Sequence, residues 1–313
     1  MKVAITGAGG YLGSLLVRAH AARGDTVHAL ARDARTIPAE TGATCVSVDL
    51  THPERVPQAF FEQADVLYHC AAEISNEAFM RPVNVDATRA LLARVRGHVG
   101  HWVQVSSLSV YGHPGAGVVT EETPLRPASL YARTKCEADA LVAEQAQSAF
   151  TYTIVRPSAI IGRAMRNRSM YALIDAVARG RFAFIGAPDA IGNFVHEDNI
   201  VEALLLCGTH PQAKSKTYNV SQNCTIERMI DAIAAALGTP SPRMRIPPTL
   251  ARLAAQVGRV LPGFPLTPGR VAALTSRVNY PTERIERELQ YRNGKSIEDA
   301  VRQLVALHQE SLR

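Results

Sequence analysis

The chain has 313 residues, of which 47% are hydrophobic and 20% charged, so its composition excludes a disordered protein. This length is enough for one large domain or one and a half. The formal net charge is +6, and only five of the 34 basic residues are lysine. The arginines are scattered, with no run of five or six, so we expect no nucleic-acid-binding surface.

Neither a metal site nor a membrane anchor is expected. The five cysteines are odd in number and far apart, and no Cys-x-x-Cys pair or Cys/His cluster indicates zinc. The chain runs from its first residue into a strand pattern, without the pattern of a signal peptide. No uninterrupted apolar run is long enough to span a membrane. We therefore expect a cytoplasmic protein without a membrane partner.

A glycine-rich turn stands near the start of the chain, between a predicted strand and a predicted helix. Residues 2–6 form a short apolar run that ends in glycine, which is typical of a buried strand. Residues 7–13 read Gly-Ala-Gly-Gly-Tyr-Leu-Gly, a helical apolar pattern follows them, and residues 26–30 predict a second strand. This order of strand, turn, helix and strand is typical of dinucleotide-binding units.

Each glycine of this turn has an expected role. Gly7 permits the tight turn, Gly10 lets the backbone approach a pyrophosphate, and Gly13 lets the helix pack closely on the sheet. The N-terminus of the helix adds free N–H groups and the positive end of the helix dipole. From this turn we assign to the cofactor site Gly7, Gly9, Gly10, Tyr11, Leu12 and Gly13.

The residues after the second strand predict which dinucleotide binds. An acidic residue at this place binds the ribose hydroxyls of NAD, whereas an arginine accommodates the phosphate of NADP. Here Ala31 stands where the acidic residue is expected, and Arg32 follows it. Because an arginine can form a fork against a phosphate, we favour NADP(H). NAD(H) stays the alternative if the turn is one residue longer, since Asp33 then takes the acidic position.

A third strand is predicted over residues 45–48, and it ends in Asp49 and Leu50. We assign both residues to the cofactor site. Asp49 is placed to bind the adenine amino group, although the alternative is that it caps the next turn. Residues 56–64 predict a helix.

The fourth predicted strand, residues 65–72, ends in two small residues, Ala71 and Ala72. Small residues at the carboxyl end of a strand let a cofactor lie against the backbone, so both are assigned to the cofactor site. His69 on this strand is interpreted as a packed core histidine. Asn84 begins the next predicted helix, where it either bridges the backbone to the cofactor or water, or caps the helix.

The catalytic candidates follow an apolar strand pattern at residues 102–105. This strand leads into Ser107, and Tyr131 and Lys135 come later at a spacing of four. If Tyr131 opens a helix, the two side chains lie on one face, one turn apart. A free tyrosine has a pKa of roughly 10, and a neighbouring ammonium lowers that pKa towards the range of efficient acid–base catalysis. Ser107 is placed to hydrogen-bond the substrate oxygen with which Tyr131 would exchange a proton. At the end of the strand, we add to the cofactor site Val105 and Ser106.

Strands that alternate with helices through the first half of the chain predict an α/β fold, with the doubly wound parallel sheet of the Rossmann architecture. Pro157 is expected to end the ladder of its strand, and we place Pro157 and Ser158 at the cofactor site. We expect a dinucleotide-binding domain at residues 1–160, with its sheet completed by later segments. Residues 161–313 are expected to form a smaller α+β substrate-binding region.

Two helices of this later region carry further expectations. Asp198 or Asn199 is expected to cap a helix at residues 200–207. A proline-rich segment surrounds an Ala/Leu/Val helix pattern at residues 250–260. We interpret this helix as an element that covers the substrate, because its apolar face is short for an interfacial membrane anchor.

Taken together, these motifs resemble the extended short-chain dehydrogenase/reductase family over nearly the whole chain. The matching elements are Thr6-Gly7-x-x-Gly10-x-x-Gly13, Asp49-Leu50, His69-x-Ala71-Ala72, Asn84-Val85-x-x-Thr88, Ser106-Ser107 with Val110-Tyr111-Gly112, Tyr131-x-x-x-Lys135 and Arg156-Pro157 with Gly162. The resemblance implies that Tyr131 is the proton donor or acceptor and that Ser107, rather than Ser106, orients the carbonyl. It implies that Lys135 holds the nicotinamide ribose, so Tyr131 and Lys135 also belong to the cofactor site.

Within that family, the active-site motifs favour a reductase. Dehydratases carry an Asp-Glu pair where this chain has Leu108-Ser109, and epimerases carry an asparagine in the turn that here reads Pro157-Ser158-Ala159. The chain looks more like 3β-hydroxysteroid dehydrogenases and dihydroflavonol reductases. Apolar residues that suit a small apolar substrate, or else form core, are Met165, Met170, Phe182, Phe184, Leu250 and Leu253.

The predicted function is therefore an NADP(H)-dependent interconversion of a ketone or aldehyde and an alcohol by hydride transfer. The alternative is a nucleotide-sugar epimerase that uses tightly bound NAD. The resemblance also implies a homodimer through the helices that start near Asn84 and Tyr131. On these helices we expect exposed faces that include Leu91, Leu141 and Val142.

Overall fold

Seven parallel strands form the central sheet of this computed structural model, which describes residues 1–146, 150–163, 165, 168–260 and 266–311. In order across the sheet, the strands are β11 (Lys216–Val220), β7 (Thr151–Pro157), β5 (Val99–Val105), β4 (Ala64–His69), β1 (Lys2–Thr6), β2 (Thr26–Ala31) and β3 (Thr44–Ser47). From β1, the chain builds the sheet first to one side and then to the other. This doubly wound order confirms the predicted Rossmann architecture.

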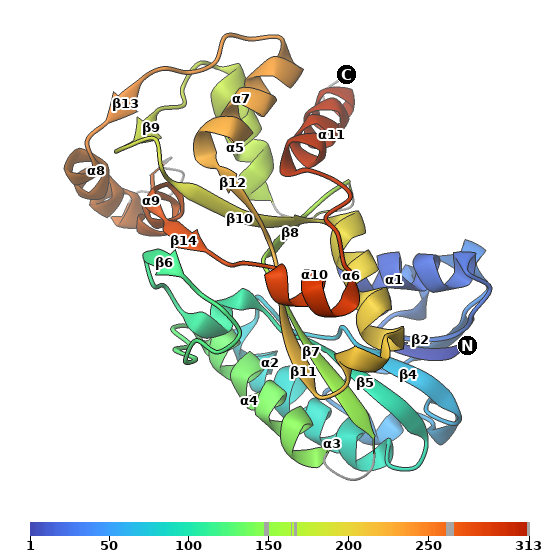
Figure 1. The fold of residues 1–313 in the computed structure, drawn as a ribbon. Helices are drawn as coiled ribbons and strands as arrows, with labels where there is room; N and C mark the ends of the chain where they lie inside the picture. Colours follow the sequence, from blue (N-terminus) through green and yellow to red (C-terminus); the bar gives the residue numbers. More distant parts are fainter. Residues whose placement is uncertain (147–149, 164, 166–167, 261–265, 312–313) are drawn as a thin grey trace.

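Helices cover both faces of the sheet (Figure 1). One face is packed by α1 (Tyr11–Ala22) and α6 (Glu197–Thr209), the other by α3 (Ala87–Arg94) and α4 (Leu130–Gln145). Successive side chains of β1 point to opposite faces, so Val3 and Ile5 join one core and Ala4 joins the other. Burial on both faces explains why this strand is apolar without alternation.

The strand β11 lies beyond residue 160 in sequence and pairs with β7 at the edge of the central sheet. Pro157 is the last residue of β7 and lies opposite Val220. The expectation that this proline ends the ladder is therefore wrong by one residue. The next amide, that of Ser158, donates to the carbonyl of Val220 at 3.0 Å and continues the pairing.

The C-terminal part is built on three small sheets, shown above the central sheet in Figure 1. Their strands are β6 (Ala116–Val118), β8 (Ala159–Ile161), β9 (Phe184–Ile185), β10 (Ile191–His196), β12 (Gln222–Thr225), β13 (Arg245–Ile246) and β14 (Arg277–Asn279). The helices are α5 (Arg168–Ala178), α7 (Ile226–Leu237), α8 (Pro248–Val260), α9 (Pro268–Thr275), α10 (Glu283–Leu289) and α11 (Ile297–Ser311). Because β6 pairs with β14, the segment that follows Ser107 is tied to the C-terminal part.

Four of the six apolar residues that either suit a substrate or form core are core. Met165, Met170, Phe182 and Phe184 are each 6% exposed and belong to one cluster, which α5, α7 and α11 enclose. The second of their two interpretations holds, since a side chain packed among these helices offers little surface to a ligand.

Three local expectations also fail. Residues 56–64 form no α-helix, because Pro57 interrupts them and leaves two short 3₁₀ turns, Pro53–Arg55 and Gln58–Phe60. The helix α6 is capped by His196, whose Nδ1 accepts from the amide of Asp198 at 3.0 Å, and not by Asp198 or Asn199. Asn84 does not begin a helix, because α2 (Glu77–Arg81) already runs through a π-helical turn, Pro82–Asp86, into α3.

The prediction that three apolar side chains form an exposed dimer contact is wrong as well. Leu91, Leu141 and Val142 are 0%, 7% and 0% exposed and pack between their helices and the central sheet. They lie on the sheet-facing sides of α3 and α4, so a second copy cannot reach them. Among the described residues, no helix combines the length and the apolar character needed to cross a bilayer.

Candidate active site

The residues assigned to the site from sequence come together at one edge of the central sheet, beyond the carboxyl ends of its strands. They are the turn 7–13 after β1, Arg32 after β2, Asp49 and Leu50 after β3, Ala71 and Ala72 after β4, Ser106 and Ser107 after β5, and Ser158 after β7, with Val105 and Pro157 as last residues of their strands. Ligands of α/β sheets bind at this edge, where the direction of strand order reverses. Here that point lies between β1 and β4.

The glycine turn leaves room for nothing but glycine at its tightest points. Gly7 has a φ of +67°, and a Cβ there would lie 2.7 Å from the backbone nitrogen of Ala71. A Cβ on Gly13 would lie 2.8 Å from the carbonyl carbon of Gly7, so only glycine lets α1 begin so near the turn. Gly10 caps α1 without a side-chain hydrogen bond, which leaves the first amides of the helix to a ligand. These features fit the phosphates of a dinucleotide.

The arginine and the aspartate that follow β2 are engaged differently. Asp33 accepts from the amide of Arg35 at 3.0 Å and pairs with its guanidinium at 2.8 Å. Arg32 is exposed beside the glycine turn. A Cβ on Gly9 would contact Ala31 at 3.3 Å, so the end of β2 lies directly against that turn. A fork from Arg32 to a ribose phosphate fits this arrangement, whereas Asp33 already has a cationic partner.

Asp49 caps the turn after β3, as in the second of its two interpretations. It accepts from the amide and the hydroxyl of Thr51 at 2.9 and 3.0 Å. The backbone hydrogen bond from Thr51 and the charge of Arg32 lower the pKa of Asp49. Its carboxylate therefore stays ionised at the edge of the sheet, where it also remains a candidate for the adenine amino group.

Several side chains assigned to the cofactor serve the protein interior. Leu12 and Leu50 are 9% and 6% exposed and pack in the two cores of the sheet. The hydroxyl of Tyr11 donates to Glu197 at 2.8 Å. These positions lie at the edge of the sheet where the cofactor is expected, but their side chains are engaged with the protein.

Asn84 supports the site from behind. Its Oδ1 accepts from the amide of Glu73 at 2.8 Å, and its Nδ2 donates to the carbonyl of Glu73 at 2.9 Å and to the hydroxyl of Thr134 at 3.0 Å. These bonds tie the loop after β4 to the helix α4, which carries Tyr131. Neither bridging to a ligand nor capping describes this role, because both ends of the side chain amide are bound to protein.

His69 is a core histidine, in agreement with its interpretation from sequence. It is 1% exposed, and its ring nitrogens lie 2.7 and 3.0 Å from the hydroxyls of Thr6 and Thr88. Burial lowers the pKa of His69 to about 3, so the ring is neutral at physiological pH.

Ser107, Tyr131 and Lys135 come together as expected. The helix α4 begins at Leu130, and its cap Ser129 accepts from the amide of Ala132 at 3.1 Å. This start places Tyr131 in the first turn of α4, where the hydroxyl of Ser107 is close enough to act on its phenol. Lys135 follows one turn later and is 2% exposed. A proton donor, a second hydroxyl and a buried ammonium thus lie at the edge where the cofactor is expected.

The pKa of Tyr131 differs from the sequence expectation. Burial raises the pKa of Tyr131 to about 12, the charge of Asp139 acts in the same direction, and the hydrogen bond from Ser107 opposes them. Burial also lowers the pKa of Lys135. The phenol pKa is therefore raised and not lowered as expected, because removal of the phenolate from water destabilises it more than the neighbouring groups stabilise it.

A buried polar cluster behind these residues was missed from sequence. Asp139 accepts from the hydroxyl of Ser106 at 2.7 Å and contacts the guanidinium of Arg156 at 3.4 Å. Arg156 donates to the hydroxyl of Tyr111 at 2.9 Å, and this hydroxyl donates to Asn219 at 3.0 Å. The spacing of four between Lys135 and Asp139 is the signal that could have found it.

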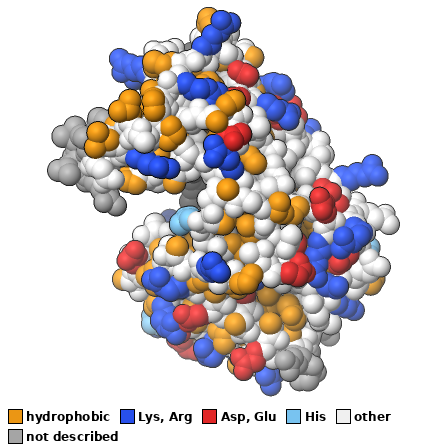
Figure 2. Space-filling view, turned by 60° about the vertical axis from the view of Figure 1, so that its left-hand side comes forward, with side chains coloured by type: hydrophobic (Ala, Val, Ile, Leu, Met, Phe, Trp, Pro, Cys, Tyr) orange, Lys and Arg blue, Asp and Glu red, His pale blue; other side chains and the backbone are white. Residues whose placement is uncertain are grey.

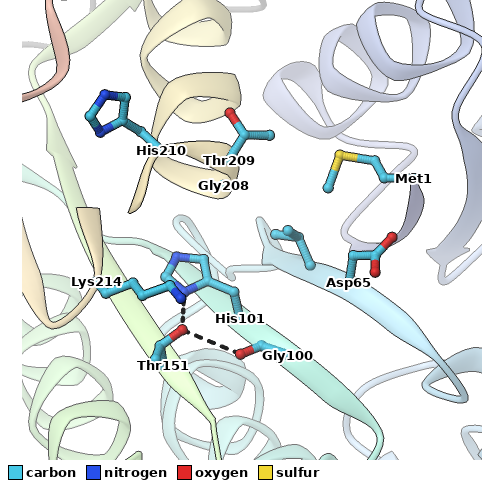
Figure 3. Close-up of a pocket in the computed structure, with 10 residues that line it drawn as sticks. Met1, Asp65, Gly100, His101, Thr151, Gly208, Thr209, His210 and Lys214 are labelled. Atoms are coloured by element: carbon cyan, nitrogen blue, oxygen red, sulfur yellow. Dashed lines mark hydrogen bonds between the residues drawn. The ribbon is translucent and has the colours of Figure 1, made fainter. Parts of the chain in front are cut away.

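A pocket of about 310 Å³ lies at the opposite, amino-terminal edge of the sheet (Figure 3). Several of its polar groups are already paired. His101 hydrogen-bonds the hydroxyls of Thr151 and Thr153 at 2.7 and 3.0 Å, and the hydroxyl of Thr209 donates to a carbonyl of its own helix at 2.9 Å. Burial lowers the pKa of His101 to about 4. We therefore do not place the active site in this pocket.

Figure 2 shows a hollow between the upper and the lower part of the molecule. On this side of the fold, α8 and α9 lie above and β6 lies below (Figure 1). Leu250 and Leu253 of α8 are 58% and 69% exposed, while Ala251 and Ala255 hold the helix to its neighbours. Among the described residues, no group of three His, Cys, Asp or Glu side chains is arranged to hold a metal.

Comparison with known proteins now places the chain in a family. The sequence model of the NAD dependent epimerase/dehydratase family matches residues 3–221, which include every residue of the site. The chain belongs to this family. Its relatives are NAD(P)-dependent dehydrogenases, reductases and epimerases of the extended short-chain type, and the chain is an NAD(P)-dependent enzyme of that type.

Two relatives with descriptive names match more than four fifths of this chain. Sterol demethylase protein B from Methylococcus capsulatus is 31% identical, with 91% of this chain and 88% of the relative covered. A 4-hydroxy-2-methyl-3-oxo-4-farnesyl-3,4-dihydroquinoline-1-oxide ketoreductase from Stigmatella aurantiaca is 30% identical, with 83% and 80% covered.

Solved structures of similar fold are more distant in sequence. A UDP-glucuronic acid 4-epimerase from Bacillus cereus in complex with NAD has a TM-score of 0.77 and 16% identity, with all of both chains covered (100% each). A short-chain dehydrogenase/reductase superfamily protein from Agrobacterium tumefaciens with bound NAD has a TM-score of 0.75 and 21% identity, with 100% and 98% covered. At these identities the likeness shows the fold alone.

Proposed function

We propose that this family member is an NADP(H)-dependent carbonyl reductase, which interconverts a ketone or aldehyde and an alcohol on a small apolar substrate. The observation that carries the proposal is that the hydroxyl of Ser107 lies close enough to the phenol of Tyr131 to act on it, with Lys135 buried one turn further along α4. This arrangement presents two hydroxyl groups to one substrate oxygen, beside the glycine turn that fits a dinucleotide.

The side chains have separate roles in the proposed reaction. When bound, the nicotinamide ring supplies the hydride for reduction and accepts it for oxidation. In reduction, Tyr131 donates its phenolic proton to the carbonyl oxygen, and Ser107 donates a hydrogen bond to the same oxygen. Lys135 would hold the nicotinamide ribose, and its charge stabilises the phenolate that Tyr131 leaves behind. In oxidation the same groups act in reverse.

The preference for NADP(H) over NAD(H) rests on Arg32. Its guanidinium is exposed at the end of β2, whereas the rival acidic residue, Asp33, is paired with Arg35. A carboxylate that already has a cationic partner is a weaker acceptor for ribose hydroxyls, and an exposed guanidinium matches a phosphate dianion.

Replacement of Arg32 by alanine is expected to raise the KM for NADPH by about ten- to a hundred-fold and to leave the KM for NADH within about two-fold, because a charge-assisted contact contributes about 1.5–3 kcal/mol. Steady-state kinetics with both cofactors measure this. Arg18→Ala is the matched control, since it removes an arginine of α1 that pairs with Glu40. It should change neither the KM for NADPH nor the KM for NADH. Equal losses with NADPH and NADH would contradict the role given to Arg32.

The apolar character of the substrate is supported by two observations. The relatives at 30–31% identity include a ketoreductase whose named substrate carries a farnesyl chain. In this chain, the apolar side chains of Leu250 and Leu253 on α8 are exposed. We propose that residues 161–313 bind the substrate and that α8 covers it.

The test is the oxidation of NADPH and NADH, followed by near-ultraviolet absorbance, with a panel of ketones and aldehydes that includes steroids, flavonoids, aryl ketones and short sugars. We expect loss of reduced cofactor with an apolar carbonyl, and faster loss with NADPH. Tight cofactor binding without consumption, together with interconversion of nucleotide sugars, would instead support the epimerase alternative.

Two further features belong to the same proposal. We propose that the enzyme acts in the cytoplasm. We also propose that it forms a homodimer, as the family resemblance implies. Since Leu91, Leu141 and Val142 are buried, the contact would use the outward faces of the same helices, where Arg89, Arg133 and Glu137 are exposed.

A further inference from the structure

A buried carboxylate lies on the same face of α4 as the catalytic pair. Asp139 follows Lys135 by four residues and Tyr131 by eight, so the three side chains lie one above another along the helix. Asp139 is 3% exposed. Its Oδ2 accepts from Ser106, and its Oδ1 makes no hydrogen bond within the described part of the chain.

Elements packed against α4 surround this carboxylate with opposite charge. From β7, the Nε and Nη2 of Arg156 each lie 3.4 Å from Oδ2 of Asp139. The same guanidinium donates to the hydroxyl of Tyr111 at 2.9 Å and lies 5.2 Å from the centroid of its ring. Tyr111 belongs to the 3₁₀ turn that begins directly after Ser107, so the cluster braces that turn from behind.

The remaining titratable groups near the carboxylate are neutral. The thiols of Cys70, at the end of β4, and Cys136, on α4, both have pKa values raised by burial, to about 12 and about 11. Lys135 and Arg156 are therefore the cations that face Asp139. Burial raises the pKa of Asp139, but the charges of Arg156 and Lys135 and the hydrogen bond from Ser106 oppose this rise. A carboxylate between two cations stays ionised at neutral pH.

We propose that Asp139 is a positioning residue whose negative charge holds both Tyr131 and Lys135 in their protonated forms. An anion disfavours the phenolate and favours the ammonium, so its field acts on the two partners in the same sense. Its charge acts on each of them in the direction that raises their pKa. The consequence rests on the proposed function: a proton donor that stays protonated to higher pH extends carbonyl reduction further into the alkaline range.

The direct test is replacement of the charge by a neutral group of the same shape, Asp139→Asn. Both pKa values fall when the anion is removed, and the alkaline limb of the pH profile of kcat for carbonyl reduction should move down by about one pH unit. Asp139→Glu, which keeps the charge, should restore the wild-type midpoint. Tyr111→Phe removes a hydroxyl from the same cluster without a change of charge, and its midpoint should stay where the wild-type midpoint is.

A second measurement does not need turnover. In enzyme labelled with ¹³Cζ-tyrosine and loaded with NADP⁺, the signal of Tyr131 is identified by its loss in Tyr131→Phe, and its titration midpoint should fall in Asp139→Asn. An unchanged midpoint, or equal shifts in the Asn and Glu variants, would overturn the role of Asp139. If no carbonyl is reduced by the wild-type protein, the proposed function fails, and the NMR midpoint still decides the role of Asp139. Should the Asn variant not fold, Asp139→Ser supplies the neutral side chain.

Discussion

Replacement of Tyr131 by phenylalanine is expected to lower kcat for carbonyl reduction by about a thousand-fold, within the range that a positioned proton donor contributes, while the KM for NADPH changes by less than about three-fold. The ring of the variant still fills the same space in the first turn of α4, beside Ser107. Only the phenolic hydroxyl is missing, and Ser107 alone is a much weaker acid. Stopped-flow or steady-state assays with a carbonyl found in the substrate panel measure both constants.

The matched control is Tyr152→Phe. Tyr152 lies near the start of β7, at the amino-terminal end of the strand and so at the edge of the sheet opposite Tyr131. Its variant should keep kcat within about two-fold, because the ring keeps its packing against the core and only a hydroxyl remote from the chemistry is lost. A Tyr131→Phe enzyme that had the kcat and the melting temperature of the wild-type protein would show that another group donates the proton.

The sequence predicts the placement of the candidate site residues where this placement depends on order along the chain. Parallel strands all end at the same edge of a sheet, so the residues after each strand meet there whatever the details of packing. For this reason the glycine turn, Arg32, Ser107 and Tyr131 could be placed together from their positions after successive strands. The helix start at Leu130 was likewise within one residue of the expected position.

The polar cluster behind the site depends on packing between distant segments and was missed. Ser106, Asp139 and Arg156 come from the end of β5, from α4 and from β7, and each is 6% exposed or less. Nothing in their separate local patterns shows that they meet. Only the register of β5 against β7, which places Val105 beside Val155, brings Ser106 and Arg156 together.

Burial also reversed several expectations that were based on residue type. Leu91 and Val142 were expected to be exposed, but the helical period turns both to the sheet. For Tyr131, the neighbouring ammonium was expected to decide the pKa, yet burial decides it. In both cases the sequence contains the residue type and the spacing. The exposure of the leucine and valine side chains and the pKa of the tyrosine depend instead on how far packing removes each side chain from water.

Replacement of Gly7 by alanine is expected to destabilise the fold by about 3 kcal/mol, the sum of a left-handed backbone for a residue with a Cβ and the overpacking of a tight contact. The φ of Gly7 is +67°, and the new Cβ would meet the nitrogen and the Cα of Ala71 at 2.7 Å and the carbonyl carbon of Cys70 at 2.9 Å. These atoms belong to the backbone that follows β4. They cannot move aside easily, since β4 is paired on both sides, with β1 and β5.

Gly24→Ala separates the two contributions to this cost. Gly24 has a φ of +77°, close to that of Gly7, but a Cβ there would have no atom within 4 Å. Its variant should lose only about 1 kcal/mol, the backbone contribution. Thermal unfolding followed by circular dichroism should therefore show a fall in Tm of about 10 °C for Gly7→Ala against about 3 °C for Gly24→Ala, at about 2–4 °C per kcal/mol. Equal losses would mean that the backbone after β4 gives way, and that the glycine is required at this turn for its conformation alone.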